Sequence, residues 1–310
     1  MARVAAVDCG TNSIRLLIAD SDGAGGLVDV VRDMVIVRLG EGVDATGRFR
    51  DDAIERTRVA LAGYVDAMKT HGVQRVRMVA TSATRDASNR DAFFAMTAEL
   101  LGQVVPGAVA EVISGDEEAH LSFRGAVGGL DPAEGPFVVT DLGGGSTEVV
   151  MTDAAYSANI GCVRLTEHSL HSDPPTPAEV ESAEAFVAQR LAPAFEAVAV
   201  ERARTWVGVA GTLTTIAALD LGLTEYDSDA IHLSRHAFTD VEKICRDLVA
   251  DTRAVRAAMG PMHPGRVDVI GGGALVTIAL AQEFARRAGI SELVVSEHDI
   301  LDGIALGLLD

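Results

Sequence analysis

The stretch Val138–Met151 reads VVTDLGGGSTEVVM and is the most informative part of the sequence. Apolar, mostly β-branched residues flank three glycines, which predicts a strand, a glycine-rich turn and a second strand. Consecutive glycines let the backbone approach a ligand and direct several N–H groups at one point, as phosphate-binding loops do. Ser146 and Thr147 add hydroxyl groups, and Asp141 ends the first strand, where it is placed to hold a magnesium ion. An ordinary hairpin turn is the alternative, and the flanking polar residues favour phosphate.

A second copy of this pattern lies near the start of the chain, where residues 4–18 read VAAVDCGTNSIRLLI. The two copies align at four positions: Asp8 with Asp141, Gly10 with Gly143, Ser13 with Ser146, and Arg15 with Glu148. Both read as strand, Asp-x-Gly, small polar turn and strand. An internal repeat constrains the whole fold, and this one predicts two related lobes that face each other across a cleft.

Composition limits the possible functions. A chain of 310 residues exceeds the size at which one core usually divides, so two domains are expected. No apolar run approaches the roughly 20 residues of a membrane span, and the chain begins directly with a strand, so we expect a cytoplasmic protein that does not bind membranes. The net charge of −19 argues against nucleic-acid binding, and any phosphate site must therefore be locally positive. The three cysteines show no paired spacing, which fits reduced thiols and argues against a zinc site.

The first half of the chain alternates strands and helices, as α/β domains do. A helix is expected over 51–71, and a buried strand over 76–81 leads to Arg85. A strand over 111–113 runs into a helix at Ser114, where Ser114 and Glu117 form the pattern of a capping box. Glu118 has no such structural role, and we interpret it as an acid placed to meet a water near the phosphate. Favourable interaction with the helix dipole is the alternative.

The second half begins after a linker over 130–136. Residues 159–166 are expected to form a strand and a turn, and 177–198 a helix with Thr176 as N-cap. Residues 206–215 and 268–275 each predict a strand, a glycine turn and the start of a helix. The first of these makes Gly211 and Thr212 a candidate anion site at a helix N-terminus, with simple turn chemistry as the alternative. A last strand over 292–296 and a terminal helix from 299 complete the chain.

Three motifs taken together resemble one family. They are VDCGTNS over 7–13, ISGDEEA over 113–119 and DLGGGSTE over 141–148, and they resemble the exopolyphosphatase/guanosine pentaphosphate phosphatase (Ppx/GppA) family in order and separation. The resemblance covers essentially the whole chain. It implies an α/β fold of two ribonuclease-H-like lobes, as in actin, hexokinase and Hsp70, with a phosphate-binding cleft between them. The lobes are expected over 1–130 and 131–310, and the terminal helix 299–310 is assigned either to the second lobe or to the first.

The resemblance implies an exopolyphosphatase that hydrolyses the terminal phosphoanhydride of inorganic polyphosphate and releases orthophosphate. The candidate catalytic residues are Glu118 as general base, with Arg85 and Arg15 neutralising phosphate oxygens and Arg164 as a weaker choice. The candidate substrate-binding residues are Asn12, Ser13, Gly143, Gly144, Gly145, Ser146, Thr147, Gly211 and Thr212. The candidate ligands of Mg²⁺, with Mn²⁺ as an alternative ion, are Asp141, Glu148 and Asp8.

Other functions stay open at this point. Guanosine pentaphosphate, cleaved to the tetraphosphate, presents the same terminal bond as polyphosphate. A sugar or acetate kinase uses similar loops, although Glu118 in its motif favours hydrolysis. A non-catalytic sensor of alarmone or polyphosphate is a third alternative, against which the acids Glu118, Asp141 and Glu148 argue. The family resemblance also implies a homodimer, and the chain length predicts a preference for short polyphosphate.

Overall fold

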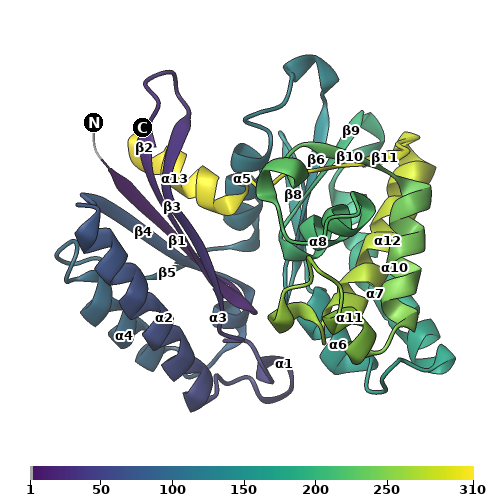
Figure 1. Cartoon of the computed structure of the whole chain (residues 1–310), viewed down its shortest axis with the longest axis horizontal. Coiled ribbons are helices and arrows are strands. Elements are labelled where there is room, and N and C mark those ends of the chain that lie inside the picture. The colour runs from purple at the N-terminus through teal and green to yellow at the C-terminus, as the bar shows by residue number, and fades with distance from the viewer. Residues whose placement is uncertain (1–2) are drawn as a thin grey trace. The chain divides into compact units, whose positions relative to one another are not determined.

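The computed structural model describes residues 3–310 and divides the chain into two compact units (Figure 1). The first unit is the chain up to Gly128 together with Ile300–Asp310, and the second unit is Gly129–Asp299. The terminal helix therefore packs with the first unit, although the chain reaches it from the last strand of the second.

The first unit is built on a five-stranded sheet in the order β3-β2-β1-β4-β5. The strands are β1 Val4–Cys9, β2 Ser13–Ser21, β3 Leu27–Ile36, β4 Arg75–Ala80 and β5 Glu111–Val112. β1, β2 and β3 are antiparallel neighbours, whereas β1, β4 and β5 run parallel. All six residues of β1 are buried, as expected for a central strand covered on both faces.

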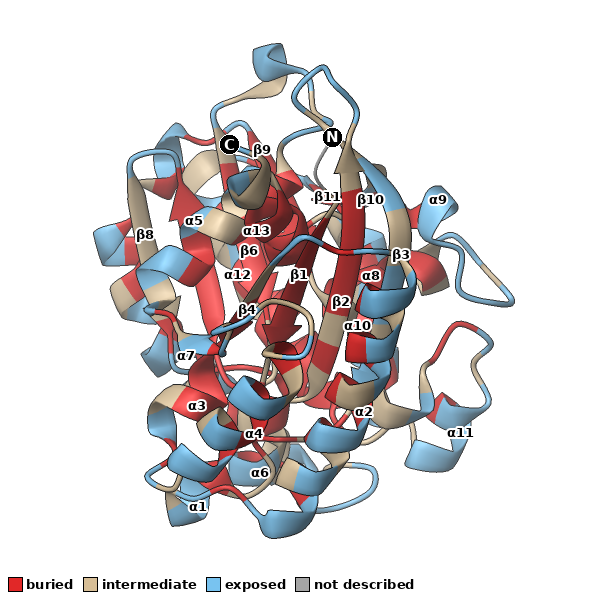
Figure 2. Ribbon diagram, turned by 90° about the vertical axis from the view of Figure 1, so that its left-hand side faces the viewer, coloured by how far each residue is buried: buried red, intermediate tan, exposed pale blue. Residues whose placement is uncertain are grey.

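Helices cover both faces of this sheet. They are α1 Val43–Thr46, α2 Asp51–Thr70, α3 Ser82–Asp86, α4 Asp91–Leu101, α5 Gly115–Ala126 and α13 Ile300–Leu309. One apolar cluster joins α2 and α4 to one face of the sheet, and a second joins α13 to the other face (Figure 2, red ribbons). The expected helix over 51–71 is confirmed as α2, and Gly72 follows it with a φ of 67°, which glycine adopts without strain.

The second unit repeats the topology. Its six-stranded sheet has the order β10-β11-β9-β6-β7-β8, so β8-β7-β6-β9-β11 corresponds to β3-β2-β1-β4-β5 and β10 is an additional antiparallel edge strand. The strands are β6 Phe137–Leu142, β7 Thr147–Met151, β8 Ala154–Ala158, β9 Thr205–Val209, β10 Ser234–Ala237 and β11 Glu292–Val295. The two-lobed α/β fold expected from the repeated hairpins is thereby confirmed.

The helices of the second unit surround one large apolar core. They are α6 Cys162–Ser169, α7 Pro177–Ala197, α8 Gly211–Asp220, α9 Ser228–Ile231, α10 Phe238–Ala250, α11 Arg253–Ala257 and α12 Ile270–Ala288, with 3-10 turns η1 Pro132–Glu134, η2 Val200–Arg202 and η3 Pro264–Arg266. Trp206 on β9 is fully buried in this core. It contacts the rings of Phe238 and Phe284, and its Nε1–H donates to Thr140 Oγ1 at 2.8 Å.

Two local predictions are wrong. Residues 162–169, in a region expected as strand and turn, form helix α6, and Gly271–Gly273 lie inside helix α12 instead of in a turn. The three glycines are buried because neighbouring helices approach the backbone of α12 there. A Cβ on Gly272 would lie 2.6 Å from Thr166 Oγ1 of α6, and a Cβ on Gly273 would lie 2.5 Å from Thr212 Cγ2 of α8. These glycines therefore serve close helix packing.

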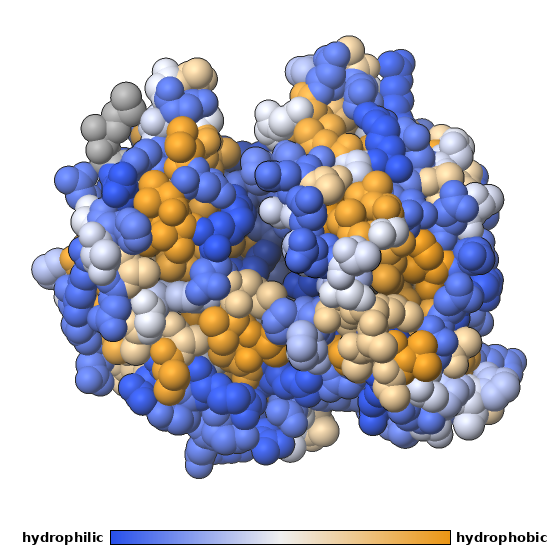
Figure 3. Space-filling view, viewed as in Figure 1, coloured by the Kyte–Doolittle hydropathy of each residue, from blue (hydrophilic) through white to orange (hydrophobic). Residues whose placement is uncertain are grey.

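Within residues 3–310 no helix is long and apolar enough to cross a membrane. On the face drawn in Figure 3, apolar patches alternate with hydrophilic side chains over both units. The large apolar side chains that are most exposed, such as Val28, Val59 and Val255, are scattered over separate elements.

The glycine packing in α12 predicts a stability difference. Gly272→Ala should lower the free energy of unfolding by roughly 1–3 kcal/mol, because the added methyl group overlaps α6 in a packed core. Gly63→Ala in α2 is the matched control, since nothing lies within 4 Å of its Cβ position, and it should raise that free energy by roughly 0.5–1 kcal/mol through helix propensity. Urea denaturation measures both, and a neutral Gly272→Ala would contradict the packing role.

Candidate active site

The predicted site residues lie at the carboxyl ends of the parallel strands in each sheet, where α/β proteins bind their ligands. In the first unit, β1 leads into the turn at Gly10, β4 leads into the helix that carries Arg85, and β5 leads into the helix that carries Glu118. In the second unit, β6 ends next to the turn at Gly143, and β9 leads to Gly211.

The β1–β2 turn is held in one conformation by backbone hydrogen bonds. The N–H of Gly10 donates to the carbonyl of Ser13 at 2.9 Å and closes the turn. The carbonyl of Asn12 accepts from the N–H groups of Val37 and Arg38, at 3.0 and 2.8 Å. The segment after β3 therefore fixes the backbone of Asn12 and Ser13, two of the predicted substrate contacts.

Asp8 and Arg15 face each other across this hairpin. They are register partners on β1 and β2, and Arg15 Nη2 lies 2.7 Å from Asp8 Oδ2. The side chains of Asp8 and Arg15 are 8% and 19% exposed, so this ion pair is largely shielded from water. Arg15 was expected to contact phosphate and Asp8 to bind metal, whereas in the structure the two side chains bind each other.

Glu118 and Arg85 form a second ion pair in the first unit. Arg85 Nη1 lies 2.8 Å from Glu118 Oε2 and also donates to the carbonyl of Ile113 at 3.1 Å. Glu118 is 7% exposed in the first turn of α5, whereas Arg85 on α3 is half-buried. The guanidinium therefore fixes the direction of the Glu118 carboxylate relative to the end of β5.

The capping box expected at the start of α5 is only half formed. Ser114 Oγ accepts from the N–H of Glu117 at 3.2 Å, as an N-cap should. The Glu117 carboxylate instead binds Arg77 at 2.6 Å in a solvent-exposed ion pair. An arginine on the adjacent strand β4 thus offers Glu117 a stronger, charged partner than a backbone N–H.

The β6–β7 turn of the second unit has the same closure, with the N–H of Gly143 donating to the carbonyl of Ser146 at 3.1 Å. Its other carbonyls accept hydrogen bonds from the first residues of α6. The carbonyl of Gly143 accepts from Cys162 at 3.0 Å, and the carbonyl of Gly144 accepts from Val163 at 2.9 Å. Arg164 Nε donates to the carbonyl of Gly145 at 2.8 Å. One donor of Arg164, the weaker candidate for neutralising phosphate, is therefore used within the turn.

These contacts determine where the N–H groups of the turn point. In a trans peptide the N–H points opposite to the carbonyl of the preceding residue. Because the carbonyls of residues 143–145 are directed at α6, the N–H groups of Gly144, Gly145 and Ser146 point away from it and can converge on an anion. Gly161 makes the approach possible, since a Cβ there would lie 2.6 Å from the carbonyl oxygens of Gly143 and Gly144. Gly161 was not among the predicted site residues, because its partners Gly143 and Gly144 lie far from it in the sequence.

Asp141 and Glu148 are register partners, as Asp8 and Arg15 are in the first unit. They are 6% and 0% exposed, and Ser157 Oγ donates to Glu148 Oε1 at 2.6 Å. Two carboxylates directly opposite on neighbouring strands repel each other, and burial increases the cost. A cation beside them would offset that repulsion.

The loop after β9 carries backbone strain. Ala210 has φ 72° and ψ 167°, a region that only glycine occupies readily. Gly211 and Thr212 follow as the first residues of α8, and Thr212 is 4% exposed. Because β6 and β9 pair Asp141 with Val209, this strained loop lies beside the acidic pair.

Arg266 is a further candidate that sequence analysis missed. Its guanidinium covers Gly211, where a Cβ would overlap it, and Nη1 donates to Thr215 Oγ1 at 3.1 Å. A cation at a helix N-terminus is unfavourable unless an anion shares the site. In the sequence Arg266 stands five residues before the buried glycines of α12, and that position carries no information about Gly211.

The cysteines are unsuited to covalent chemistry. Cys9, Cys162 and Cys245 are all buried and none forms a disulfide. Burial raises the pKa of Cys162 to about 11, against opposing effects of the Thr212 hydroxyl and Arg266. Burial, reinforced by Asp8, also raises the pKa of Cys9 well above its usual range. Both thiols are therefore protonated at neutral pH and are poor nucleophiles.

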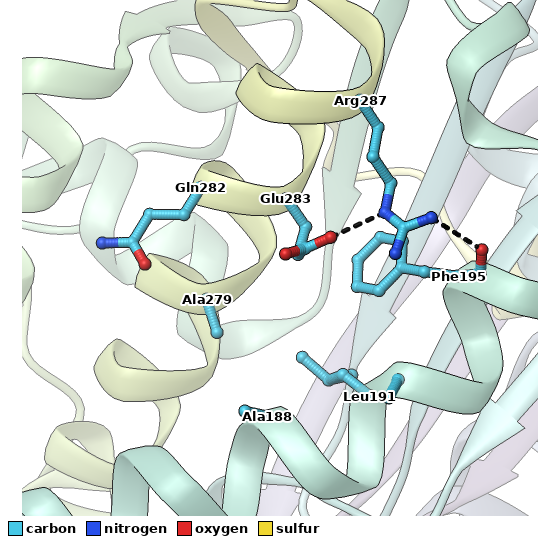
Figure 4. A pocket seen from close by; sticks show the side chains of 8 residues that line it. Ala188, Leu191, Phe195, Ala279, Gln282, Glu283 and Arg287 are labelled. Carbon is cyan, nitrogen blue, oxygen red and sulfur yellow. Dashed lines mark hydrogen bonds and ion pairs between the residues drawn. The ribbon is translucent and has the colours of Figure 1, made fainter.

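A pocket of about 170 Å³ opens between α7 and α12 (Figure 4). Leu191, Phe195 and alanines form its apolar part. At its rim, Arg287 binds Glu283 at 2.6 Å and the carbonyl of Phe195 at 3.1 Å. The lining residues include none of the predicted site residues, and these contacts occupy the charged groups at the rim.

Comparisons with known proteins identify the family of this chain. A sequence model of the Ppx/GppA phosphatase family matches residues 17–307. The chain belongs to the Ppx/GppA phosphatase family. It is 61% identical to Exopolyphosphatase 2 of Mycobacterium tuberculosis, over 99% of both chains. Among solved structures, an exopolyphosphatase-like protein is 42% identical with a TM-score of 0.93, covering 99% of this chain and 97% of the other. The Ppx/GppA enzyme of Aquifex aeolicus is 31% identical with a TM-score of 0.79, covering 99% of both.

For this Ppx/GppA family member, the strain at Ala210 predicts a stability gain. Ala210→Gly should raise the free energy of unfolding by roughly 1 kcal/mol, because glycine adopts a φ of 72° without steric cost. Ala217→Gly in the following helix is the control, and it should lower that free energy by at least roughly 0.5–1 kcal/mol. Denaturant titration distinguishes the two, and a destabilising Ala210→Gly would contradict the strain.

Proposed function

We propose that this chain is an exopolyphosphatase that removes terminal phosphates from inorganic polyphosphate. The observation that carries the proposal is full-length similarity, at 61% identity, to a protein named Exopolyphosphatase 2. Glu118, which is paired with Arg85, and the β6–β7 turn would supply the two chemical functions that such a reaction needs. They are activation of water and stabilisation of negative charge.

The turn over Gly143–Thr147 is proposed to bind the terminal phosphate. The directions of the N–H groups of Gly144, Gly145 and Ser146 support this role, because successive N–H groups form an anion-binding concavity. A binding site made of backbone dipoles suits a chain with a net charge of −19, since it needs few basic side chains. Asn12, Ser13, Gly211 and Thr212 are proposed as further substrate contacts, with Arg266 added on the basis of its position over Gly211.

Glu118 is proposed as the general base. It would accept a proton from water as the water oxygen attacks the terminal phosphorus. The bond from that phosphorus to the bridging oxygen breaks, and the products are orthophosphate and a polyphosphate shorter by one unit. Arg85 would keep the Glu118 carboxylate in position before the reaction through the 2.8 Å contact.

Asp141 and Glu148 are proposed to hold Mg²⁺. Both are buried register partners with hard oxygen donors, which fits the ion. Within residues 3–310 no group of three or more His, Cys, Asp and Glu side chains forms a metal cage, and Mg²⁺ commonly binds one or two carboxylates with water and substrate phosphate. When bound, the ion would offset the charge on the phosphate oxygens. Mn²⁺ is the alternative ion, and Asp8 is a weaker ligand candidate because it binds Arg15.

The assay that tests the function measures orthophosphate release by the purified protein with Mg²⁺, from short polyphosphate and from guanosine pentaphosphate in parallel. Release mainly from polyphosphate supports the proposal. Release mainly from the nucleotide assigns the chain to guanosine pentaphosphate hydrolysis, and binding of either without release indicates a sensor. The homodimer stays a prediction as well, and light scattering in solution measures it.

Glu118→Gln should lower kcat by roughly 10²–10⁴-fold, the loss typical of a general base. The fold should persist, because glutamine keeps the size of the side chain and can still accept a hydrogen bond from Arg85. Glu117→Gln is the matched control, since its exposed carboxylate binds Arg77 and has no proposed part in the reaction. A fully active Glu118→Gln variant would refute the assignment of the base.

Glu148→Gln should weaken metal binding by at least roughly 10-fold, a loss typical even for residues outside the ligand shell. Two readouts apply: the Mg²⁺ concentration that gives half-maximal activity, and direct Mn²⁺ binding followed by electron paramagnetic resonance without substrate. Asp153→Asn is the control, because that exposed carboxylate at the far end of β7 binds Arg202. Unchanged Mn²⁺ binding in Glu148→Gln would exclude Glu148 as a ligand.

A further inference from the structure

Helix α13 lies directly against α5, the helix that presents Glu118 in its first turn. The contact is backbone against backbone, because Gly303 faces the carbonyl of Leu121, one turn after Glu118. A Cβ at position 303 would overlap the Leu121 carbonyl oxygen. The absence of a side chain at Gly303 therefore sets how closely the two helices approach.

An ion pair holds α13 next to this contact. Asp302 is 3% exposed and accepts from Arg32 of β3 through both carboxylate oxygens, at 2.6 and 3.2 Å. A bidentate pair of this kind restrains orientation as well as distance. Since Asp302 precedes Gly303, the pair fixes the rotation of α13 at the point where it meets α5.

The apolar side of α13 also packs against Ile113, next to the start of α5. Ile300 and Ile304 belong to one buried cluster with Ile113, the residue between β5 and the N-cap of α5. The carbonyl of Ile113 is one of the two acceptors of Arg85, and Glu118 is the other. The packing of α13 therefore affects the positions of both acceptors of Arg85, the Ile113 carbonyl and the Glu118 carboxylate.

We propose that Gly303 is a positioning residue for phosphoanhydride hydrolysis. It sets the position of α5 and thereby the placement of the Glu118 carboxylate relative to Arg85 and the attacking water. This inference rests on the proposed function, in which Glu118 is the general base. Any larger residue at position 303 must push the helices apart by a distance on the order of 1 Å, and misplacement on that scale costs roughly 10²-fold in rate.

The same helix offers a matched control. Gly307 lies one turn further along α13, and a Cβ there would meet only Arg124 Nη1, at 4.0 Å, which is ordinary contact. Gly303→Ala and Gly307→Ala gain the same helix propensity. They differ in whether the new methyl group displaces α5.

The experiment compares the two variants in short-polyphosphate hydrolysis, each alone and combined with Glu118→Gln. Gly303→Ala should lower kcat by roughly 10–100-fold with KM within about twofold of the parent value, because transition-state geometry is lost and ground-state binding is kept. Gly307→Ala should match the parent. In the Glu118→Gln background, Gly303→Ala should change kcat by less than about threefold, since the group it positions is already removed.

An unchanged kcat in Gly303→Ala would overturn the inference, as would an equal loss of kcat in both backgrounds or an increase in KM alone. Circular dichroism verifies folding. If Gly303→Ala does not fold, Asp302→Asn replaces it, because this change weakens the ion pair with Arg32 without adding a heavy atom, and it is compared in the same two backgrounds. The results distinguish failure of the proposed general base from failure of the role of Gly303. An active Glu118→Gln refutes the base and the inference together, whereas an inactive Glu118→Gln with a fully active Gly303→Ala refutes the inference alone.

Discussion

Strand register at the two central hairpins is the constraint on which the arrangement of the candidate residues depends. The same antiparallel pairing places Asp8 opposite Arg15 in one unit and Asp141 opposite Glu148 in the other. One pair joins opposite charges in an ion pair, whereas the other places two buried carboxylates opposite each other. A repeated backbone thus carries two different charge pairings.

In the second unit, glycine serves both the turn after β6 and the close packing of helices. The run Gly143–Gly145 forms a tight turn whose carbonyls face α6, while Gly161 lets that helix approach the turn. The run Gly271–Gly273 is helical, and it lets α12 pack against both α6 and α8, which lie behind the two loops of the second unit. Close contact of helices through glycine is therefore what keeps those loops in place.

The sequence predicted the features that depend on near neighbours. The two hairpins, the N-cap at Thr176 and the placement of Glu118 in a first helical turn all follow from local patterns, and all are present. The helical glycines of α12 were misread because a glycine run after apolar residues has the same local pattern in a turn and in a packed helix. What decides between them is contact with Thr212 and other residues far away in the sequence. The Arg85–Glu118 pair and the position of Arg266 depend on such distant contacts too, and local periodicity holds no information about them.

The burial of Trp206 has a consequence for measurement. It is the only tryptophan in the chain and lies in the core of the second unit, with its indole N–H bound to Thr140. Tryptophan fluorescence therefore reports on the second unit alone, whereas circular dichroism reports on the helices of both. Coincident unfolding curves from the two signals would mean that the units lose structure in one cooperative step, and separate curves would resolve two steps. The protein thus carries an optical probe for the coupling between its halves without any label.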